Sequence, residues 1–331
     1  MSDTAMSLRA TLANCHGLAV AAMKSVSPDR LRRYPDPSAN KVRDIVAGLF
    51  GVRRENVLCG NGSDELLTLV VRACVGEGET LAYPTPTYSL YPVLAEIQGA
   101  KALEIPTADD FSLPVEALQK AKARLLILCN PNAPTGVFAP PEVIGEIAAR
   151  FRGVVVVDEA YVDFSRAHCM SLAAERPNVL VFRTLSKSYS LAGLRFGYAV
   201  GPADLISGLE KVKDSYNVDA VSIELAAAAL KDQEWMLANV EKIRSERARL
   251  TAGLTKRGFA VTPSEANFIL VRAPGGGDAR PYYELLKGRG ILVRYWNLPR
   301  IADKLRITVG TPEENNALLV ALESVVKEVR K

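Results

Sequence analysis

Between residues 57 and 201, short apolar runs alternate with helical patterns, and this alternation restricts the possible fold more than any other feature of the sequence. Each run is continuously apolar, which indicates a strand buried on both faces. Helical stretches such as Ser63–Cys74 and Pro141–Phe151 lie between the runs. The pattern predicts an α/β domain with a mainly parallel sheet covered by helices on both sides. The runs are Thr80–Tyr83, Leu125–Cys129, Val154–Val157, Val179–Phe182 and Phe196–Val200.

After Gly201 the pattern changes to long helices and short strands, which is typical of a smaller α+β domain. We predict a large domain over residues 31–240 and a small domain over residues 241–331, and we expect the N-terminal segment 1–30 to join the small domain. Residues 273–277 (APGGG) form a flexible loop inside the small domain. Helices are predicted at Ile223–Lys231, Glu234–Arg257, Tyr282–Arg289 and Pro312–Val326, and strands at Phe259–Val261, Asn267–Val271, Ile291–Arg294 and Leu305–Val309.

The composition argues against several classes of protein. Basic residues exceed acidic ones only by 41 to 37 and are spread along the chain, so we expect no nucleic-acid partner. No apolar run approaches the ~18 residues of a membrane span, and the N-terminus does not resemble a signal peptide. The five cysteines form no CxxC pair, which fits a reducing cytoplasm. His16 and His168 are isolated, so no metal site is expected.

Polar residues follow the apolar runs at the ends where an open parallel sheet binds its ligands. Asp158 follows Val154–Val157, Lys187 lies shortly after Val179–Phe182, and Arg195 comes eight residues later. Taken alone, each residue can be explained without a catalytic role, because an aspartate after a strand often caps a helix and a lysine is usually solvated. Together at neighbouring strand ends they predict a catalytic site.

A glycine-bearing turn, Gly60-Asn61-Gly62-Ser63, adds a candidate anion site where the helix Ser63–Cys74 begins. Backbone amides at a helix N-terminus bind phosphate. The helix dipole contributes only ~0.3–2 kcal/mol, so side-chain donors are needed as well. Ser186 and Arg195 are the candidates, since arginine makes bidentate bonds to phosphate. Taken alone, the turn would also fit a hairpin.

The segment Thr184–Gly197, TLSKSYSLAGLRFG, strongly resembles the cofactor-lysine segment of the fold-type I aminotransferases. The nearest resemblance is to the histidinol-phosphate aminotransferases. GNGSDE, YPTPTY, NPNAPTG, DEAYVDF and LRITVGT occur in that family's order, from about Leu31 to the end of the chain. The resemblance implies a homodimeric pyridoxal-phosphate (PLP) enzyme that passes the amino group of histidinol phosphate to 2-oxoglutarate by a ping-pong reaction. Its products would be imidazole acetol phosphate and glutamate.

The resemblance also assigns roles to single residues. Lys187 would carry the cofactor as a Schiff base and move a proton to and from the substrate Cα. Asp158 would pair with the ring nitrogen and have the cofactor, not a side chain, as its partner, while Tyr161 would bond the ring's phenolate oxygen. The other implied residues are Tyr88 on the ring face; Gly62, Ser63, Asp64, Ser186 and Arg195 around the phosphate; Tyr34 toward the phosphate of the other subunit; and Arg306, Arg294 and Asn267 around the substrate.

The sequence departs from the family pattern at two places. Ala133 stands where the family has an asparagine that donates to the phenolate oxygen, and either Asn132 or Tyr161 alone would have to fill that role. One lost hydrogen bond is worth ~0.5–1.5 kcal/mol, which weakens the site without abolishing its chemistry. Residues 12–17 also form a shortened version of the segment that covers the substrate, which affects specificity more than reaction type.

Three alternatives stay open at this level. An aromatic amino-acid aminotransferase would use the same residues on a different amino donor. A decarboxylase similar to threonine-phosphate decarboxylase would release CO2 in place of exchanging amino groups. A non-catalytic module of the same fold would not take up PLP, and the presence of Lys187 disfavours it.

Overall fold

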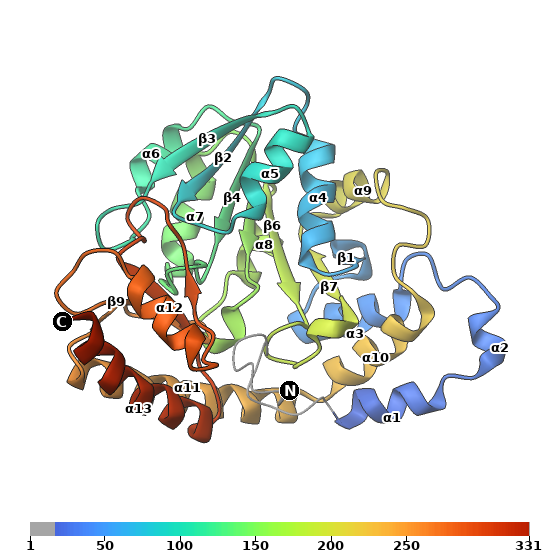
Figure 1. The fold of residues 1–331 in the computed structure, drawn as a ribbon. Coiled ribbons are helices and arrows are strands. Elements are labelled where there is room, and N and C mark those ends of the chain that lie inside the picture. Colours follow the sequence, from blue (N-terminus) through green and yellow to red (C-terminus); the bar gives the residue numbers. More distant parts are fainter. Residues whose placement is uncertain (1–16, 331) are drawn as a thin grey trace.

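The computed structural model of the chain describes residues 17–330, and a seven-stranded mixed sheet with helices on both faces forms its centre (Figure 1). The strand order is β1-β7-β6-β5-β4-β2-β3. Strand β7 runs in the opposite direction to the other six strands, so the predicted mainly parallel α/β sheet is confirmed. The strands are β1 Val57–Gly60, β2 Thr80–Thr85, β3 Lys101–Pro106, β4 Leu125–Cys129, β5 Val154–Asp158, β6 Val179–Thr184 and β7 Gly197–Val200.

Alternate side chains of the central strands enter two separate cores. In β4, Leu126 and Leu128 pack on one face, whereas Leu125 and Ile127 pack on the other. Burial on both faces explains why these strands are continuously apolar. The first face is covered by α1 Gly17–Ser25, α3 Asn40–Phe50, α6 Val115–Lys120, α7 Pro141–Arg150, α8 Met170–Glu175 and α10 Ala220–Lys231, and the second by α4 Ser63–Cys74, α5 Leu90–Ile97 and α9 Ala203–Glu210.

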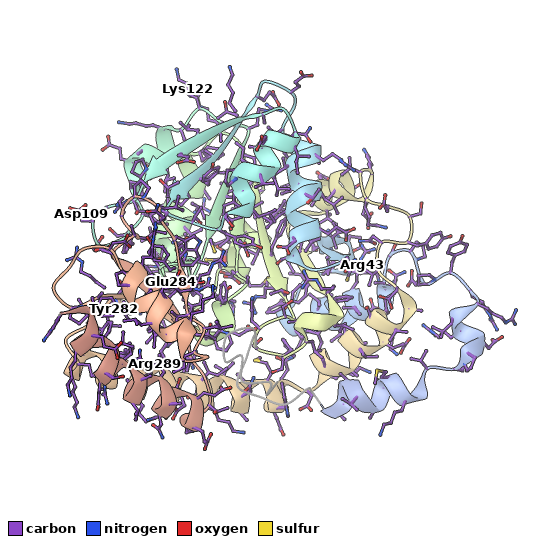
Figure 2. The ribbon with its side chains drawn as sticks, viewed as in Figure 1. Arg43, Asp109, Lys122, Tyr282, Glu284 and Arg289 are labelled. Carbon is purple, nitrogen blue, oxygen red and sulfur yellow. The ribbon has the colours of Figure 1, made fainter. Side chains whose placement is uncertain are left out.

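A second, antiparallel sheet of four strands lies beside the first, in the order β10-β11-β9-β8. Three helices cover it and form a third core, in which Tyr282 is buried (Figure 2). Asp109 and Lys122, in loops next to the large sheet, are exposed (Figure 2). Its elements are β8 Ala260–Val261, β9 Phe268–Arg272, β10 Arg294–Tyr295, β11 Lys304–Thr308, α11 Gln233–Lys256, α12 Arg280–Gly288 and α13 Pro312–Val329.

Helix α11 connects the two cores. Its first half, with Val240 and Ile243, packs in the core of the large sheet, and its second half, with Leu250 and Leu254, packs in the third core. The predicted division at residues 240/241 falls inside this continuous helix, so the domain boundary stays a prediction.

Three strands differ from the sequence prediction. The edge strand β1 was not predicted, although all four of its residues are buried. The edge strand β3 was not predicted, because four of its six residues are exposed and it contains no apolar run. The predicted strand Ile291–Arg294 pairs only from Arg294 onward, as β10. No helix within residues 17–330 is long and apolar enough to cross a membrane.

Candidate functional site

The carboxyl ends of β5 and β6 bring together the three predicted catalytic residues. Asp158 is the last residue of β5 and is 2% exposed. Lys187 follows the end of β6, the strand paired with β5 in parallel. The Nζ atom of Lys187 lies 5.0 Å from the centroid of the Tyr161 ring. An amine, a buried carboxylate and a phenol therefore share one edge of the sheet, as the strand-end pattern predicts.

Asp158 has a protein partner that the sequence did not suggest. The hydroxyl of Tyr91, on α5, donates to Asp158 Oδ2 at 2.8 Å, and the backbone N–H of Ala160 donates to Oδ1 at 3.2 Å. This corrects the expectation that no side chain contacts the carboxylate. Burial raises the pKa of Asp158 to about 6, although the bond from Tyr91 acts in the opposite direction. A cation placed against this carboxylate would favour its ionised form.

Arg195 and the first turn of α4 form an anion cradle. Gly62, the N-cap of α4, has φ 81°, and a Cβ there would lie 2.8 Å from Arg195 Nη2. Only glycine therefore allows the guanidinium so close to the turn. Arg195 Nη1 also donates to Ser186 Oγ at 3.4 Å. The guanidinium, the hydroxyl and the free amides at the start of the helix suit a phosphate group.

Asp64 connects this cradle to Tyr88. Its carboxylate accepts a hydrogen bond from Tyr88 Oη at 3.3 Å and pairs with Arg195 Nη2 at 3.2 Å. The Tyr88 ring stands edge-on to Tyr91, with centroids 5.7 Å apart. Tyr88 is thus held between the cradle and the partner of Asp158.

These groups fit pyridoxal phosphate. The cradle could hold the phosphate, and Asp158 could hold a protonated ring nitrogen that offsets its buried charge. Tyr161 could donate to the phenolate oxygen, and the Lys187 amine lies near enough to that phenol to reach the same ring. Among residues 17–330, no three metal-ligating side chains gather as a metal site would require.

Asn132 is not available for the role left open by Ala133. Its amide Nδ2 donates to Pro86 O at 3.0 Å and to Thr135 Oγ1 at 2.9 Å, while its Oδ1 accepts from Thr87 at 2.8 Å. Both amide hydrogens are therefore used inside the protein. The proposed substitution by Asn132 has no free donor, which leaves Tyr161 as the candidate donor.

Arg294 and Arg306 face each other as direct partners on β10 and β11. Their Cζ atoms lie 5.3 and 5.2 Å from the ring of Trp296, and Arg306 also lies 5.0 Å from Phe268. Arg306 Nε is buried without a hydrogen-bond partner, and no acidic side chain within residues 17–330 pairs with either guanidinium. Like charges directly opposite each other destabilise a sheet, so this pair suits a multiply charged anion.

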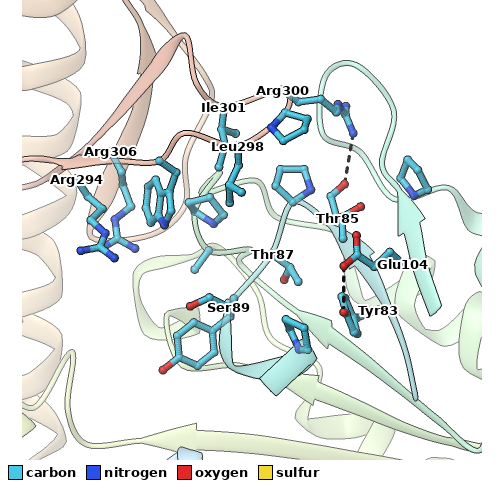
Figure 3. Close-up of a pocket in the computed structure, with 18 of the residues that line it drawn as sticks. Tyr83, Thr85, Thr87, Ser89, Glu104, Arg294, Leu298, Arg300, Ile301 and Arg306 are labelled. Atoms are coloured by element: carbon cyan, nitrogen blue, oxygen red, sulfur yellow. Dashed lines mark hydrogen bonds between the residues drawn. The ribbon is translucent and has the colours of Figure 1, made fainter. Parts of the chain in front are cut away.

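Aromatic contacts link the arginine pair to the lysine. Phe268 stands edge-on to Tyr161 with centroids 5.0 Å apart, and Tyr161 in turn contacts Lys187. A cavity of about 840 Å³ adjoins the pair, with Arg294 and Arg306 near one end and Tyr83 and Glu104 near the other (Figure 3). Tyr88 and Ala133 also line it, so it opens beside the cofactor residues.

Two predicted site residues, Tyr34 and Asn267, contact residues outside the cluster formed by the lysine, the cradle and the arginine pair. Tyr34 is 80% exposed and stacks on Tyr216 with centroids 4.4 Å apart, so in a single chain it does not join the site. Asn267 is buried just before β9, where its carbonyl accepts from Val309 N at 2.9 Å. Residues 12–16 of the shortened segment, and His16 with them, lie outside the described residues.

Sequence reasoning missed Tyr91, Phe268 and Trp296. Tyr91 lies three residues after Tyr88, but only Tyr91 belongs to α5, which begins at Leu90. Trp296 lies two residues after Arg294, and Phe268 directly follows Asn267. These spacings were visible in the sequence, but the contacts depend on how separate elements approach each other.

The family model, the similar sequences and the similar solved structures all indicate an aminotransferase. The aminotransferase class I and II family matches residues 9–322. The chain is 45% identical over 309 residues to histidinol-phosphate aminotransferase 1 of a Nostoc species, which covers 93% of this chain and 87% of that protein. It is 44% identical over 312 residues to histidinol-phosphate aminotransferase of Rhodopirellula baltica, covering 94% and 86%. The crystal structure of histidinol-phosphate aminotransferase from Sinorhizobium meliloti in complex with pyridoxal-5'-phosphate matches with a TM-score of 0.90 and 26% identity, covering 97% and 90%.

Proposed function

The chain belongs to the aminotransferase class I and II family, and on that premise we propose that it transfers the amino group of histidinol phosphate to 2-oxoglutarate. Relatives with the name histidinol-phosphate aminotransferase, at 45% and 44% identity, support this substrate. The observation that carries it is the Arg294–Arg306 pair, two facing guanidiniums that no acidic side chain of residues 17–330 neutralises.

The chain's own residues divide the catalytic work. Bound PLP supplies an electron sink for the electron pair left when the substrate Cα loses its proton. Lys187 takes that proton on Nζ and returns it later in the reaction. Asp158 would keep the ring nitrogen protonated, with Tyr91 holding the carboxylate in place. Tyr161 would donate to the phenolate oxygen, and Arg195 with Ser186 would bind the phosphate.

The arginine pair serves both halves of the reaction. Glutamate presents a carboxylate on its Cα, whereas histidinol phosphate presents a phosphate ester one methylene further out. Arg306, half-buried between Phe268 and Trp296, binds either anion through its planar fork. Arg294 adds the second positive charge that a dianionic phosphate requires.

The test is an assay of the purified protein, loaded with PLP, against a panel of amines. Histidinol phosphate, the aromatic amino acids and threonine phosphate are each supplied with 2-oxoglutarate, and both glutamate and CO2 are measured. We expect glutamate to form fastest from histidinol phosphate, without CO2. Faster use of an aromatic amino acid would favour that class of aminotransferase, and CO2 from threonine phosphate would favour a decarboxylase.

We also infer a homodimer in which Tyr34 reaches the cofactor phosphate of the partner. Tyr34 and Tyr216 form an exposed aromatic pair, 80% and 46% accessible in the single chain, which a second subunit would cover. Sedimentation at assay concentration should give a dimer, and a fully active monomer would contradict the inference. A cytoplasmic location is proposed from the free, mostly buried cysteines Cys59, Cys74, Cys129 and Cys169.

A further inference from the structure

The segment of residues 296–301, here called the strap, connects β10 to β11. It therefore joins the two strands that carry Arg294 and Arg306, and its first residue is Trp296, which contacts both guanidiniums. The strap also forms one wall of the 840 Å³ cavity, opposite the segment that carries Tyr88 (Figure 3). Its position thus affects both the arginine pair and the width of the cavity.

Arg300 fastens the strap to the large sheet. Its Nη1 donates to Thr107 O at 2.9 Å and to Thr107 Oγ1 at 3.0 Å, and its Nη2 donates to Ala108 O. Nη1 also donates to Thr85 O at 3.3 Å (Figure 3). The guanidinium also lies 5.3 Å from the Phe111 ring. The acceptors are all at the carboxyl ends of β2 and β3, so one side chain spans the two sheets.

Arg300 adopts a backbone conformation that L residues rarely use. Its φ is 68°, in the left-handed region, and Phe111 beneath it has φ 67°. Such conformations persist only where the surrounding contacts determine them. Lys304 Nζ donates to the Arg300 carbonyl at 2.8 Å, and Ile301 packs with Phe111 and Leu270. The strap is therefore held in place from both of its sides.

The two segments that Arg300 holds together, the end of β2 and the strap, each lie next to site residues. Thr85 is separated from Tyr88 only by Pro86 and Thr87, and these two bond the buried amide of Asn132. At the other end, Trp296 packs against the cluster that contains Ile301. Fixing Arg300 therefore fixes the arginine pair relative to the cofactor residues.

We propose that Arg300 is a positioning residue for substrate recognition, which sets the location of Arg294, Trp296 and Arg306 by holding the strap on the large sheet. The inference rests on the proposed function, because it concerns the anion end of the same substrate. A misplacement of about 1 Å at a distance from the reacting atoms can lower the rate by roughly 100-fold. Here the loss should fall on substrate binding, since Arg300 contacts neither Lys187 nor Asp158.

The test compares Arg300→Ala and Arg300→Lys with the control Arg257→Ala. Arg257 donates to Leu319 O and Gly253 O at 2.9 Å each and pairs with Glu323, so it makes similar bonds wholly within α11 and α13. The PLP-loaded proteins are assayed for kcat and KM with histidinol phosphate and with glutamate. Their visible absorption spectra and urea midpoints are also recorded.

We expect Arg300→Ala to raise the KM for histidinol phosphate by roughly 10- to 100-fold, with kcat within about threefold and an unchanged spectrum. Arg300→Lys should recover part of that loss, and Arg257→Ala should leave KM unchanged even where it lowers the urea midpoint. Equal KM values for Arg300→Ala and Arg257→Ala would overturn the inference.

The proposed function and this inference fail in different ways. A wild-type protein without histidinol-phosphate activity would overturn the proposed function. The KM for glutamate, which Arg306 also binds, would then test Arg300: a raised KM in Arg300→Ala would support its positioning role, and an unchanged KM would overturn it. Normal wild-type activity with an unchanged KM in Arg300→Ala would overturn the inference alone.

Discussion

Replacing Asp158 by asparagine should make the protein without cofactor more stable, although it damages the site. Burial raises the pKa of Asp158 from 3.8 to about 6. Because each pKa unit is worth about 1.4 kcal/mol, the buried charge destabilises the cofactor-free protein by about 3 kcal/mol at pH 8. Asparagine can accept only one of the two bonds from Tyr91 and Ala160, which costs about 1 kcal/mol. The expected net gain is about 2 kcal/mol.

The sign of the pH dependence follows from the same shift. An acid with a raised pKa in the folded state binds its proton more tightly there, so stability is lost as pH rises from about 4 through about 6. The variant lacks this titration. Its advantage over the wild type should therefore be large at pH 8 and should shrink or reverse near pH 4.5, where the aspartic acid is mostly protonated.

Urea unfolding of the cofactor-free proteins, at equal protein concentration and at pH 4.5, 6 and 8, measures this difference. Asp163→Asn is a matched control, because Asp163 accepts from Arg183 and Ser188 and its loss should destabilise at every pH. With PLP bound, the order should reverse, since only the carboxylate can pair with a protonated ring nitrogen. A cofactor-free Asp158→Asn protein that is less stable than wild type at pH 8 would refute the reasoning.

Four further substitutions test the site. Lys187→Ala should abolish nearly all turnover, and a variant that keeps the visible absorption of bound PLP after dialysis would exclude Lys187 as the attachment residue. Arg306→Ala should weaken both half-reactions by about 1.5–3 kcal/mol each, whereas Arg294→Ala should raise KM mainly for histidinol phosphate; equal small effects of Arg294→Ala on both substrates would argue against a phosphate-bearing substrate. Tyr91→Phe removes the bond that lowers the pKa of Asp158, so the pH range over which the cofactor-free protein loses stability should extend to higher pH, and an unmoved range in urea unfolding would show that Tyr91 does not tune the carboxylate.

The sequence predicted the central strands β4 and β5 well, and it missed the two edge strands, the buried β1 and the exposed β3. The bounds of β4 were predicted without error and those of β5 within one residue, because burial on both faces leaves an unbroken apolar run. The edge strand β3 is mostly exposed and carries Lys101 and Glu104, so hydrophobicity alone does not identify it. Helix α4 was also predicted without error, since the glycine turn marks its first residue.

For the site, the sequence located residues that belong to strand ends, and it missed residues whose role depends on packing between elements. Lys187 and Asp158 follow β6 and β5, so sheet topology alone brings them together. Tyr91 reaches Asp158 only because α5 packs over the end of β5, and no local pattern encodes that approach. The orientation of the Asn132 amide is likewise decided by Pro86 and Thr87, far away in the sequence.

The two ends of the site have opposite electrostatic requirements, and a different ligand meets each of them. Asp158 is a buried carboxylate that a cation would stabilise, and the Arg294–Arg306 pair is a concentration of positive charge that an anion would stabilise. A protonated cofactor ring satisfies the first end and a substrate phosphate the second. Each ligand therefore removes an unfavourable interaction that the free protein retains, and each also gains its own contacts. This is why we expect substitutions that neutralise either end to stabilise the free protein while they weaken binding. Asp158→Asn tests that trade-off at one end, and Arg294→Ala tests it at the other, since it removes a facing like charge from the sheet.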